Sequence, residues 1–237
     1  MLSKELIDKI SQASLTDSLR MITALYPYGV VLSSSLGQED QVLTDAIYRN
    51  NIPVKIFTID TGRLFNETYE LLEKTNARYK RNIPVYFPES SDVELFVRAR
   101  GINGFYESVA NRKECCTIRK IKPLNRALEG ASVWITGLRA EQSANRSDMP
   151  MIEWDQERQL YKFNPLIRWH YNEVLDYLKE NNVPYNSLHD KGYISIGCGP
   201  CTRAITEGED ARAGRWWWEV SQKECGLHGV TSKLIKT

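Results

Sequence analysis

Apolar residues recur along this chain in two patterns, one with the period of a helix and one as short continuous runs. Residues 2–26 carry apolar side chains at helical spacing and predict two short amphipathic helices. Short apolar runs predict buried strands at 29–33, 54–60, 85–87 and 133–137. Helical spacing returns after residue 40 and over 64–76. Strands that alternate with helices predict parallel βαβ units in a doubly wound, mostly parallel α/β sheet.

The second half of the chain continues this pattern and then loses it. Residues 151–154 and 160–163 are apolar runs split by a polar turn, which predicts a hairpin. Residues 171–181 predict a helix. Beyond Cys201 the spacing becomes irregular, and we expect one α/β domain over 1–220 followed by a mobile tail over 221–237.

Composition narrows the class of protein without naming a function. The chain has 237 residues, 42% hydrophobic and 26% charged, which suits one soluble domain with a sizeable core. A net charge of +1 gives no global field for nucleic acid or a membrane surface. No apolar stretch approaches the ~20 residues of a membrane span, and charged residues interrupt any leader-like start. An odd number of cysteines without a secretory signal predicts reduced thiols in a cytoplasm. The sequence leaves homo-oligomerisation open.

Four of the five cysteines lie in two short segments, Cys115-Cys116 and Cys198-Gly-Pro-Cys201. The Cα atoms of adjacent residues lie about 3.8 Å apart, whereas an unstrained disulfide needs roughly 4.4–6.8 Å, so the adjacent pair is not expected to bridge. The basic side chains around this pair are Arg112, Lys113, Arg119 and Lys120. Positive charge lowers thiol pKa and favours the metal-binding thiolate. We therefore interpret all four cysteines as metal ligands.

Four thiolates suit zinc or an iron–sulfur cluster. Adjacent cysteines reach two irons of a cluster more easily than one small tetrahedral ion, which favours one 4Fe–4S cluster per chain. Four buried structural thiols remain an alternative. A thioredoxin-like redox pair at Cys198–Cys201 is another, although too few residues follow it to build the rest of such a domain.

Polar residues after the first predicted strand form a candidate anion site. Successive backbone N–H groups and small side chains before a helix can cradle an anion, here at Ser33, Ser34, Ser35 and Gly37. The loop lacks the Gly-Lys-Ser/Thr ending of a Walker loop, which argues against a magnesium-nucleotide hydrolase. An ordinary serine-rich helix cap is the alternative.

Two further strand ends carry candidate binding residues. After the second strand, Asp60 could accept from a ribose or adenine group, Gly62 forms a turn, and Arg63 could meet an anion. After the fourth strand, Gly137 allows close backbone approach and Arg139 could clamp a phosphate or sulfate with its planar fork. Simple strand-to-helix turns are the alternative at both places.

Near the end of the chain, two more basic residues and the fifth cysteine complete the candidates. Arg212 and Arg215 lie beside three tryptophans, which we expect to pack, and the arginines either clamp an anion or solvate a surface. Cys225 is a candidate nucleophile, and His228 could lower its pKa or move a proton. A spare surface thiol is the alternative for Cys225.

Taken together, these motifs resemble the assimilatory sulfonucleotide reductases, in particular the cluster-bearing adenylylsulfate (APS) reductases. The resemblance runs from about residue 29 through Ser-Ser-Ser-Leu-Gly, Ile-Asp-Thr-Gly-Arg, Cys-Cys-x-x-Arg-Lys, Gly-Leu-Arg-x-x-Gln, Cys-Gly-Pro-Cys and Glu-Cys-Gly-Leu-His. It implies an adenine nucleotide α-hydrolase-like (PP-loop) fold. It also implies a 4Fe–4S cluster on Cys115, Cys116, Cys198 and Cys201.

The resemblance further implies a reaction. Cys225 would attack the sulfur of APS, release AMP and carry an S-sulfocysteine, which thioredoxin or glutaredoxin would reduce to free sulfite. Lys120 matches a family lysine between cluster and substrate, and Arg212 and Arg215 match arginines near the end of the family's chains. The close alternative is reduction of the 3′-phosphorylated substrate PAPS, or of both. More distant alternatives are a zinc-stabilised binding module and an ATP-using thiolation enzyme.

Overall fold

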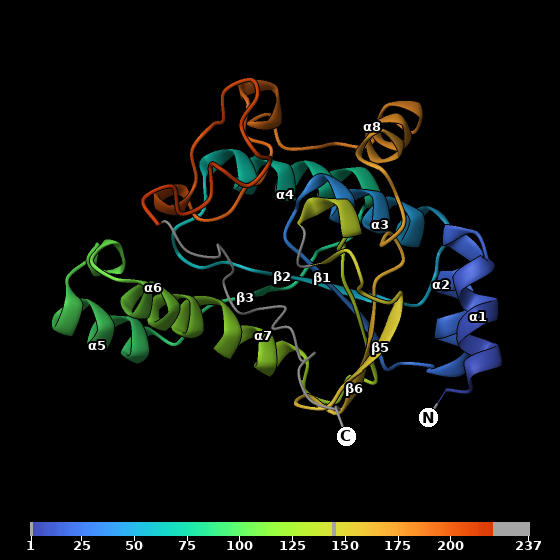
Figure 1. The fold of residues 1–237 in the computed structure, drawn as a ribbon. Helices are drawn as coiled ribbons and strands as arrows, with labels where there is room; N and C mark the ends of the chain where they lie inside the picture. Colours follow the sequence, from blue (N-terminus) through green and yellow to red (C-terminus); the bar gives the residue numbers. More distant parts are fainter. Residues whose placement is uncertain (1, 144–145, 220–237) are drawn as a thin grey trace.

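A computed structural model describes residues 2–143 and 146–219 and contains one six-stranded sheet (Figure 1). The strand order is β3-β2-β1-β4-β6-β5, and every neighbouring pair is parallel except β5 with β6. The strands are β1 (Val30–Ser34), β2 (Lys55–Ile59), β3 (Val85–Tyr86), β4 (Val133–Ile135), β5 (Ile152–Asp155) and β6 (Leu160–Phe163). The doubly wound, mostly parallel sheet and its hairpin are therefore confirmed.

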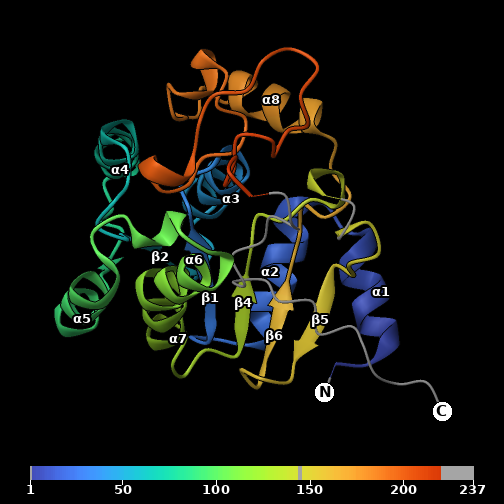
Figure 2. The same ribbon diagram turned by 60° about the vertical axis from the view of Figure 1, so that its left-hand side comes forward.

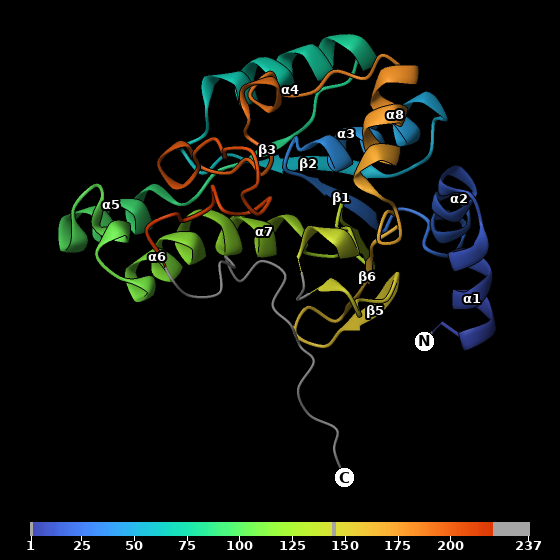
Figure 3. The ribbon, with the colours of Figure 1, turned by 45° about the horizontal axis from the view of Figure 1, so that its top comes forward.

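Helices cover both faces of this sheet (Figures 1 and 3). The first layer comprises α1 (Lys4–Gln12), α2 (Leu15–Leu25), α3 (Gln38–Arg49), α4 (Asn66–Tyr79) and α8 (Tyr171–Glu180). The opposite layer comprises α5 (Ser90–Arg100), α6 (Val109–Cys116) and α7 (Lys122–Ala127). Apolar side chains of α1, α2, α3 and α8 pack on one face of the central strands, and those of α7 pack on the other. Burying both faces explains why the strands read as continuous apolar runs.

One buried carboxylate joins three helices of the first layer. Asp45, in α3, is fully buried and accepts hydrogen bonds from Tyr79 of α4 at 2.7 Å and Tyr177 of α8 at 2.9 Å. Burial, together with the Asp45 carboxylate, raises the pKa of both phenols, so they stay protonated donors. The shared acceptor fixes α3, whose N-terminal end faces the candidate site, between its two neighbours.

The sequence pattern did not predict the helices of the opposite layer. It predicted no helix between residues 87 and 133, and the structure has α5, α6 and α7 there. The apolar residues of α5 and α6 pack on a separate cluster that includes Phe96, Phe105, Cys116 and Trp216, not on the sheet. A helix that contacts loops carries no regular apolar stripe, so periodicity does not detect it.

After α8 the described chain has little regular structure, and this includes the segment beyond Cys201 for which the sequence predicted it. It contains short 3₁₀ turns at His189–Lys191 and Gly199–Cys201 and an isolated bridge between Thr202 and Arg215. Figures 2 and 3 show this segment crossing above the sheet toward α6. Within residues 2–143 and 146–219, no helix is long and apolar enough to cross a membrane. The predicted tail, 221–237, lies outside the described residues.

Candidate active site

A cavity of about 510 Å³ opens at the carboxyl ends of β1, β2 and β4. The chain runs from β1 through β2 to β3 and then crosses back to form β4 on the other side of β1, which makes this edge the switch point of the sheet, the usual ligand site of such folds. The sequence-predicted residues that line the cavity are Ser33, Ser34, Ser35, Gly37, Lys120, Gly137, Arg139, Cys198, Arg212 and Arg215. Motifs that lie far apart in the sequence thus line one cavity.

The serine loop after β1 is organised by Asp40, in the first turn of α3. Its carboxylate accepts from the backbone N–H and the hydroxyl of Ser35, both at 2.6 Å. The Ser34 hydroxyl accepts from the N–H of Leu36, and the Ser33 hydroxyl accepts from the Trp134 indole at 2.7 Å. The loop therefore lies at the cavity as predicted, but an internal carboxylate holds the donors of Ser35.

Asp40 also connects this loop to the end of β4. A Cβ atom added to Gly137 would overlap the Asp40 carboxylate, and the Gly137 N–H donates toward it. Burial raises the pKa of Asp40 to about 6, and the charge of Glu39 adds to the rise, against the lowering effect of the Ser35 and Gly137 donors. The predicted close backbone approach at Gly137 is real, and its partner is a side chain of this protein.

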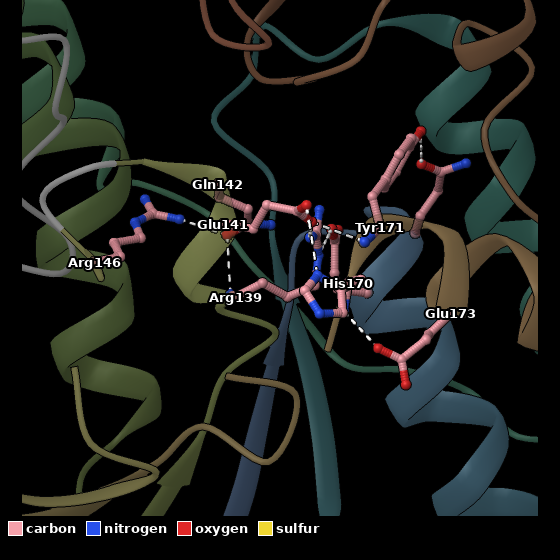
Figure 4. A network of polar contacts seen from close by, with 9 residues as sticks. Arg139, Glu141, Gln142, Arg146, His170, Tyr171 and Glu173 are labelled. Carbon is pink, nitrogen blue, oxygen red and sulfur yellow. Dashed lines mark hydrogen bonds and ion pairs between the residues drawn. The ribbon is translucent and has the colours of Figure 1, made fainter. Parts of the chain in front are cut away.

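Arg139 lies at the cavity in a network of polar contacts (Figure 4). Its guanidinium donates to Glu39 at 2.8 Å and to Glu141 at 2.7 Å and lies over the Tyr171 ring. Glu141 also accepts from the N–H of Tyr171, at the start of α8, and this bond is the largest cause of its lowered pKa. The fork predicted to clamp a substrate anion is thus already held by two carboxylates.

The turn after β2 contributes differently from the prediction. Thr61 lines the cavity, whereas Asp60, Gly62 and Arg63 do not. Asp60 accepts from the N–H of Gly62 and from the Tyr69 hydroxyl. Arg63 donates to the Ile102 carbonyl at 2.6 Å and lies over the Phe105 ring. In this structure the three predicted residues shape the turn, and Thr61 is the one that faces the site.

Cys116, Cys198 and Cys201 lie in one buried cluster with Trp216, and the partly buried Cys115 packs against it. Cys115 and Cys116 end α6, Cys198 caps the 3₁₀ turn Gly199–Cys201, and Cys201 ends that turn. The Cys198 sulfur lies 3.2 Å from the Thr61 hydroxyl. None of the four forms a disulfide with another cysteine among the described residues. The prediction that the two segments meet is borne out by this packing.

Basic neighbours lower the thiol pKa as predicted, but burial outweighs them at two of the four cysteines. Burial raises the pKa of Cys115, and it raises that of Cys201 to about 12; the Cys198 charge adds to the rise in both cases, and Lys120 opposes it. For Cys198 burial acts in the same direction but Lys120, the Thr61 hydroxyl and two arginines outweigh it, so its pKa is lowered. Arg112, one of the basic neighbours, instead pairs with Glu219.

Four cysteine sulfurs gathered at one place are a donor set that suits a metal ion or an inorganic cluster. Among the described residues, no three Cys, His, Asp or Glu side chains are close enough together to hold one metal ion. Four sulfurs around one zinc, each about 2.3 Å from it, lie only about 3.8 Å from one another. A larger inorganic group can be held by thiols that share an apolar pocket at wider spacing. The chemistry of the four donors is compatible with 4Fe–4S.

A turn of π-helix, Thr117–Ile121, follows directly after the cysteine pair. Pro123 lies just beyond it, and a proline that lacks an N–H disturbs the regular ladder of a helix. The wide turn brings Lys120 to the cavity, and Arg119 donates to the Thr61 carbonyl at 2.6 Å. π-turns occur often at functional sites, and this one connects the cysteines to the cavity.

The two late arginines predicted as candidates both line the cavity. Arg215 is buried, and its guanidinium donates to the Ser195 hydroxyl and the Ile196 carbonyl. Its guanidinium also lies against Gly197, where a Cβ atom would overlap it. The positively charged end of the cavity therefore comprises Lys120, Arg212 and Arg215 beside Cys198.

Sequence reasoning missed several cavity residues, among them Thr61, Tyr171 and His189. Burial lowers the pKa of His189, which keeps its imidazole neutral at neutral pH. Threonine, tyrosine and a lone histidine are common in any fold, so only the geometry reveals them. The predicted nucleophile Cys225 and its neighbour His228 lie outside the described residues.

The fold and this site define a class of protein: an adenine nucleotide α-hydrolase-like (PP-loop) fold with a polar cavity at its switch point and four clustered cysteines beside it. Fold similarity extends to a Candida glabrata FMN adenylyltransferase in complex with FAD and inorganic pyrophosphate, with a TM-score of 0.55 at 14% identity over 98% of this chain and 84% of that chain. That likeness shows the fold alone.

The chain belongs to the phosphoadenosine phosphosulfate reductase domain family, whose model matches residues 29–204. It is 53% identical over 200 residues to an adenosine 5′-phosphosulfate reductase of Allochromatium vinosum, covering 84% of this chain and 78% of the relative. A crystal structure of the PAPS reductase of Candida auris, in a phosphate complex, has a TM-score of 0.72 at 30% identity, covering 86% and 98%. The resemblance seen in the sequence is confirmed.

Proposed function

We propose that this protein reduces adenosine 5′-phosphosulfate to sulfite and AMP in sulfate assimilation, with thioredoxin or glutaredoxin as the reductant. The observation that carries the proposal is the cationic end of the cavity, where Lys120 and Arg215 lie beside Cys198. Relatives about half identical in sequence carry the name of this activity. Reduced thiols suit a cytoplasmic reaction of this kind.

The cavity lining includes both neutral and cationic residues. Thr58, Leu64 and Thr68 suit a nucleoside, and Lys120 and Arg215 suit the phosphosulfate anion. Lys120 and Arg215 would neutralise the sulfuryl oxygens, which otherwise repel an approaching thiolate. Arg139, already held by Glu39 and Glu141, presents a fixed and partly neutralised guanidinium that suits orientation more than tight anion binding.

The first chemical step joins the nucleophile to the substrate sulfur. The Cys225 thiolate attacks that sulfur, an S–S bond forms, and the S–O bond to the phosphate breaks, so AMP leaves with the electron pair. Glu219 is the last described residue, and the six residues from there to Cys225 span at most about 20 Å, enough to reach a neighbouring cavity. His228, close in sequence, could accept the thiol proton.

The second step releases sulfite. A thiolate of the dithiol donor attacks the Cys225 sulfur, sulfite leaves, and the second donor thiol resolves the mixed disulfide; the donor is oxidised by two electrons and Cys225 is restored. Cys115, Cys116, Cys198 and Cys201 would hold a 4Fe–4S cluster. When bound, this group supplies a fixed charge and a rigid support beside the sulfuryl end. The protein residues alone account for both steps.

Two cysteine variants test these roles in one experiment. Protein purified without oxygen should be brown, with about four iron and four sulfide per chain, and mixing with APS should add the mass of a sulfo group to Cys225. Cys225→Ser should abolish turnover and keep the colour, whereas Cys198→Ala should lose the colour. A colourless protein with stoichiometric zinc, or turnover that survives Cys225→Ser, would contradict the proposal.

The choice between APS and PAPS needs a direct comparison. Initial rates with the two nucleotides and a thioredoxin system should favour APS, because relatives about half identical in sequence carry the name of APS reductase. A clear preference for PAPS would assign the 3′-phosphorylated substrate instead and leave the two-step chemistry in place.

A further inference from the structure

Trp216 has a combination of features that simple packing does not require. Its indole is 1% exposed, and its backbone has φ of 41°, a left-handed conformation that bulky residues rarely adopt. The indole N–H is buried and has no hydrogen-bond partner among the described residues. A buried tryptophan that keeps an unfavourable backbone and an unsatisfied donor must be held there by its surroundings.

Two guanidinium groups supply those surroundings. The Arg112 guanidinium lies 4.6 Å from the Trp216 ring centroid, and the Arg215 guanidinium lies 4.7 Å from it. Arg112 is itself fixed, because it donates to both carboxylate oxygens of Glu219, at 2.9 and 2.7 Å, in a pair that is almost completely buried. The indole therefore packs against Arg112 of α6, which is itself held by a buried ion pair.

Arg215 is the member of this stack that reaches the cavity. Its guanidinium lies against the Gly197 backbone as well as over the Trp216 ring. The backbone N–H of Trp216 donates to the Cys201 carbonyl. This bond ties the turn that carries Arg215 and Trp216 to the cysteine segment.

We propose that Trp216 is a positioning residue that, clamped against the Arg112–Glu219 pair, holds the Arg215 guanidinium toward the sulfuryl end of the cavity. This inference rests on the proposed function, since it names how one substrate-binding group is oriented. Cation–π attraction is directional and strongest over an indole face. The arginine is thereby aligned before the substrate arrives, which reduces the entropy lost on binding.

A double-mutant cycle tests the coupling. APS binding is measured by calorimetry in Cys225→Ser protein, which prevents reaction, for Trp216→Leu, Arg215→Ala and the double variant. Trp216→Leu should weaken binding about tenfold, Trp216→Phe less, and Trp216→Leu should have almost no further effect once Arg215 is absent. Trp217→Leu, at a neighbouring and more exposed ring, is the matched control and should bind as the parent does.

The outcomes separate this inference from the proposed function. If the parent protein binds no APS, the proposed function fails and the inference fails with it. If the parent binds APS but the two losses are additive, or Trp216→Leu binds normally, the positioning role is wrong and the function stands. Should Trp216→Leu not fold, Gly197→Ala gives a second route: its methyl would displace Arg215 from the other side and should also weaken binding about tenfold, whereas unchanged affinity would overturn the inference.

Discussion

At the scale of single residues, the site is defined by side chains that satisfy one another before any substrate is present. Asp40 holds Ser35 and approaches Gly137, and Arg139 is held by Glu39 and Glu141. The sequence indicated the serines, the glycine and the arginine because each type is suited to anion binding. It could not indicate their internal partners, since a carboxylate next to a helix start reads equally well as an ordinary cap.

Asp40→Asn should change how stability depends on pH. The pKa of Asp40 is about 6 in the folded protein against 3.8 unfolded, so between these values the folded state holds a proton that the unfolded chain has released. Unfolding free energy therefore falls as pH rises from about 4 to 6, by about 3 kcal/mol for the full shift. The asparagine variant should not show this decrease in unfolding free energy. The measurement compares the thermal stability of each protein at pH 4 and at pH 7.

The control for this measurement is Asp176→Asn, on the exposed face of α8. It should follow the parent protein across the same pH range. The contrary result is a parent protein that becomes more stable between pH 4 and 6 relative to Asp40→Asn. It would show that the fold stabilises the charged form of Asp40, opposite to the direction expected from burial.

At the scale of elements, helices against the sheet were predictable and helices against loops were not. α3, α4 and α8 carry regular apolar faces because a sheet provides a continuous partner. α6 buries an arginine and a cysteine instead, and the π-turn after it depends on how Pro123 interrupts a helix that was itself undetected. The cysteine motif located this region by its chemistry, although periodicity could not give its shape.

The buried pair between α6 and the last described residue should contribute strongly to stability. Glu219→Gln leaves the Arg112 charge buried with a neutral partner and should lower the free energy of unfolding by about 3–5 kcal/mol. On the same helix, Glu114 forms an exposed pair with Arg100, at 3.6 Å with both side chains about half exposed. Glu114→Gln should cost about 1 kcal/mol or less in the same thermal or denaturant measurement. Equal losses of unfolding free energy in the two variants would show that the buried pair stabilises the protein no more than the exposed pair does.

At the scale of the whole molecule, the fold class and the hairpin follow from the sequence, and the interpretation of four cysteines as ligands of one group implies that the two cysteine segments meet. The strand order comes from the structure alone. The position of the cavity also follows, because polar strand ends in a parallel sheet share one edge. What does not follow is the orientation of each loop, which depends on contacts between segments far apart along the chain. Asp60, Gly62 and Arg63 illustrate this, since their motif was detected but only Thr61 faces the cavity.

A shortened chain ending at Val220 should separate binding from chemistry. The lining residues that the structure describes all lie at or before Trp216, so the shortened protein should fold, retain the colour expected of the proposed cluster and bind APS with an affinity within about threefold of Cys225→Ser. It should form no sulfo adduct and release no sulfite. Loss of the fold or of nucleotide binding would show that residues 221–237 are part of the binding domain, against the division proposed from the sequence.

The Arg112–Glu219 pair joins positions 107 residues apart, and this separation has a consequence for how the protein is made. A ribosome adding roughly 5–20 residues per second needs several seconds between the two partners, and during that interval the first cysteine pair is synthesised without the second. Any machinery that delivers iron and sulfide would therefore act on a nearly finished polypeptide. A longer delay would expose the early thiols to oxidation for longer, so slowing translation should lower the yield of protein that carries the proposed cluster.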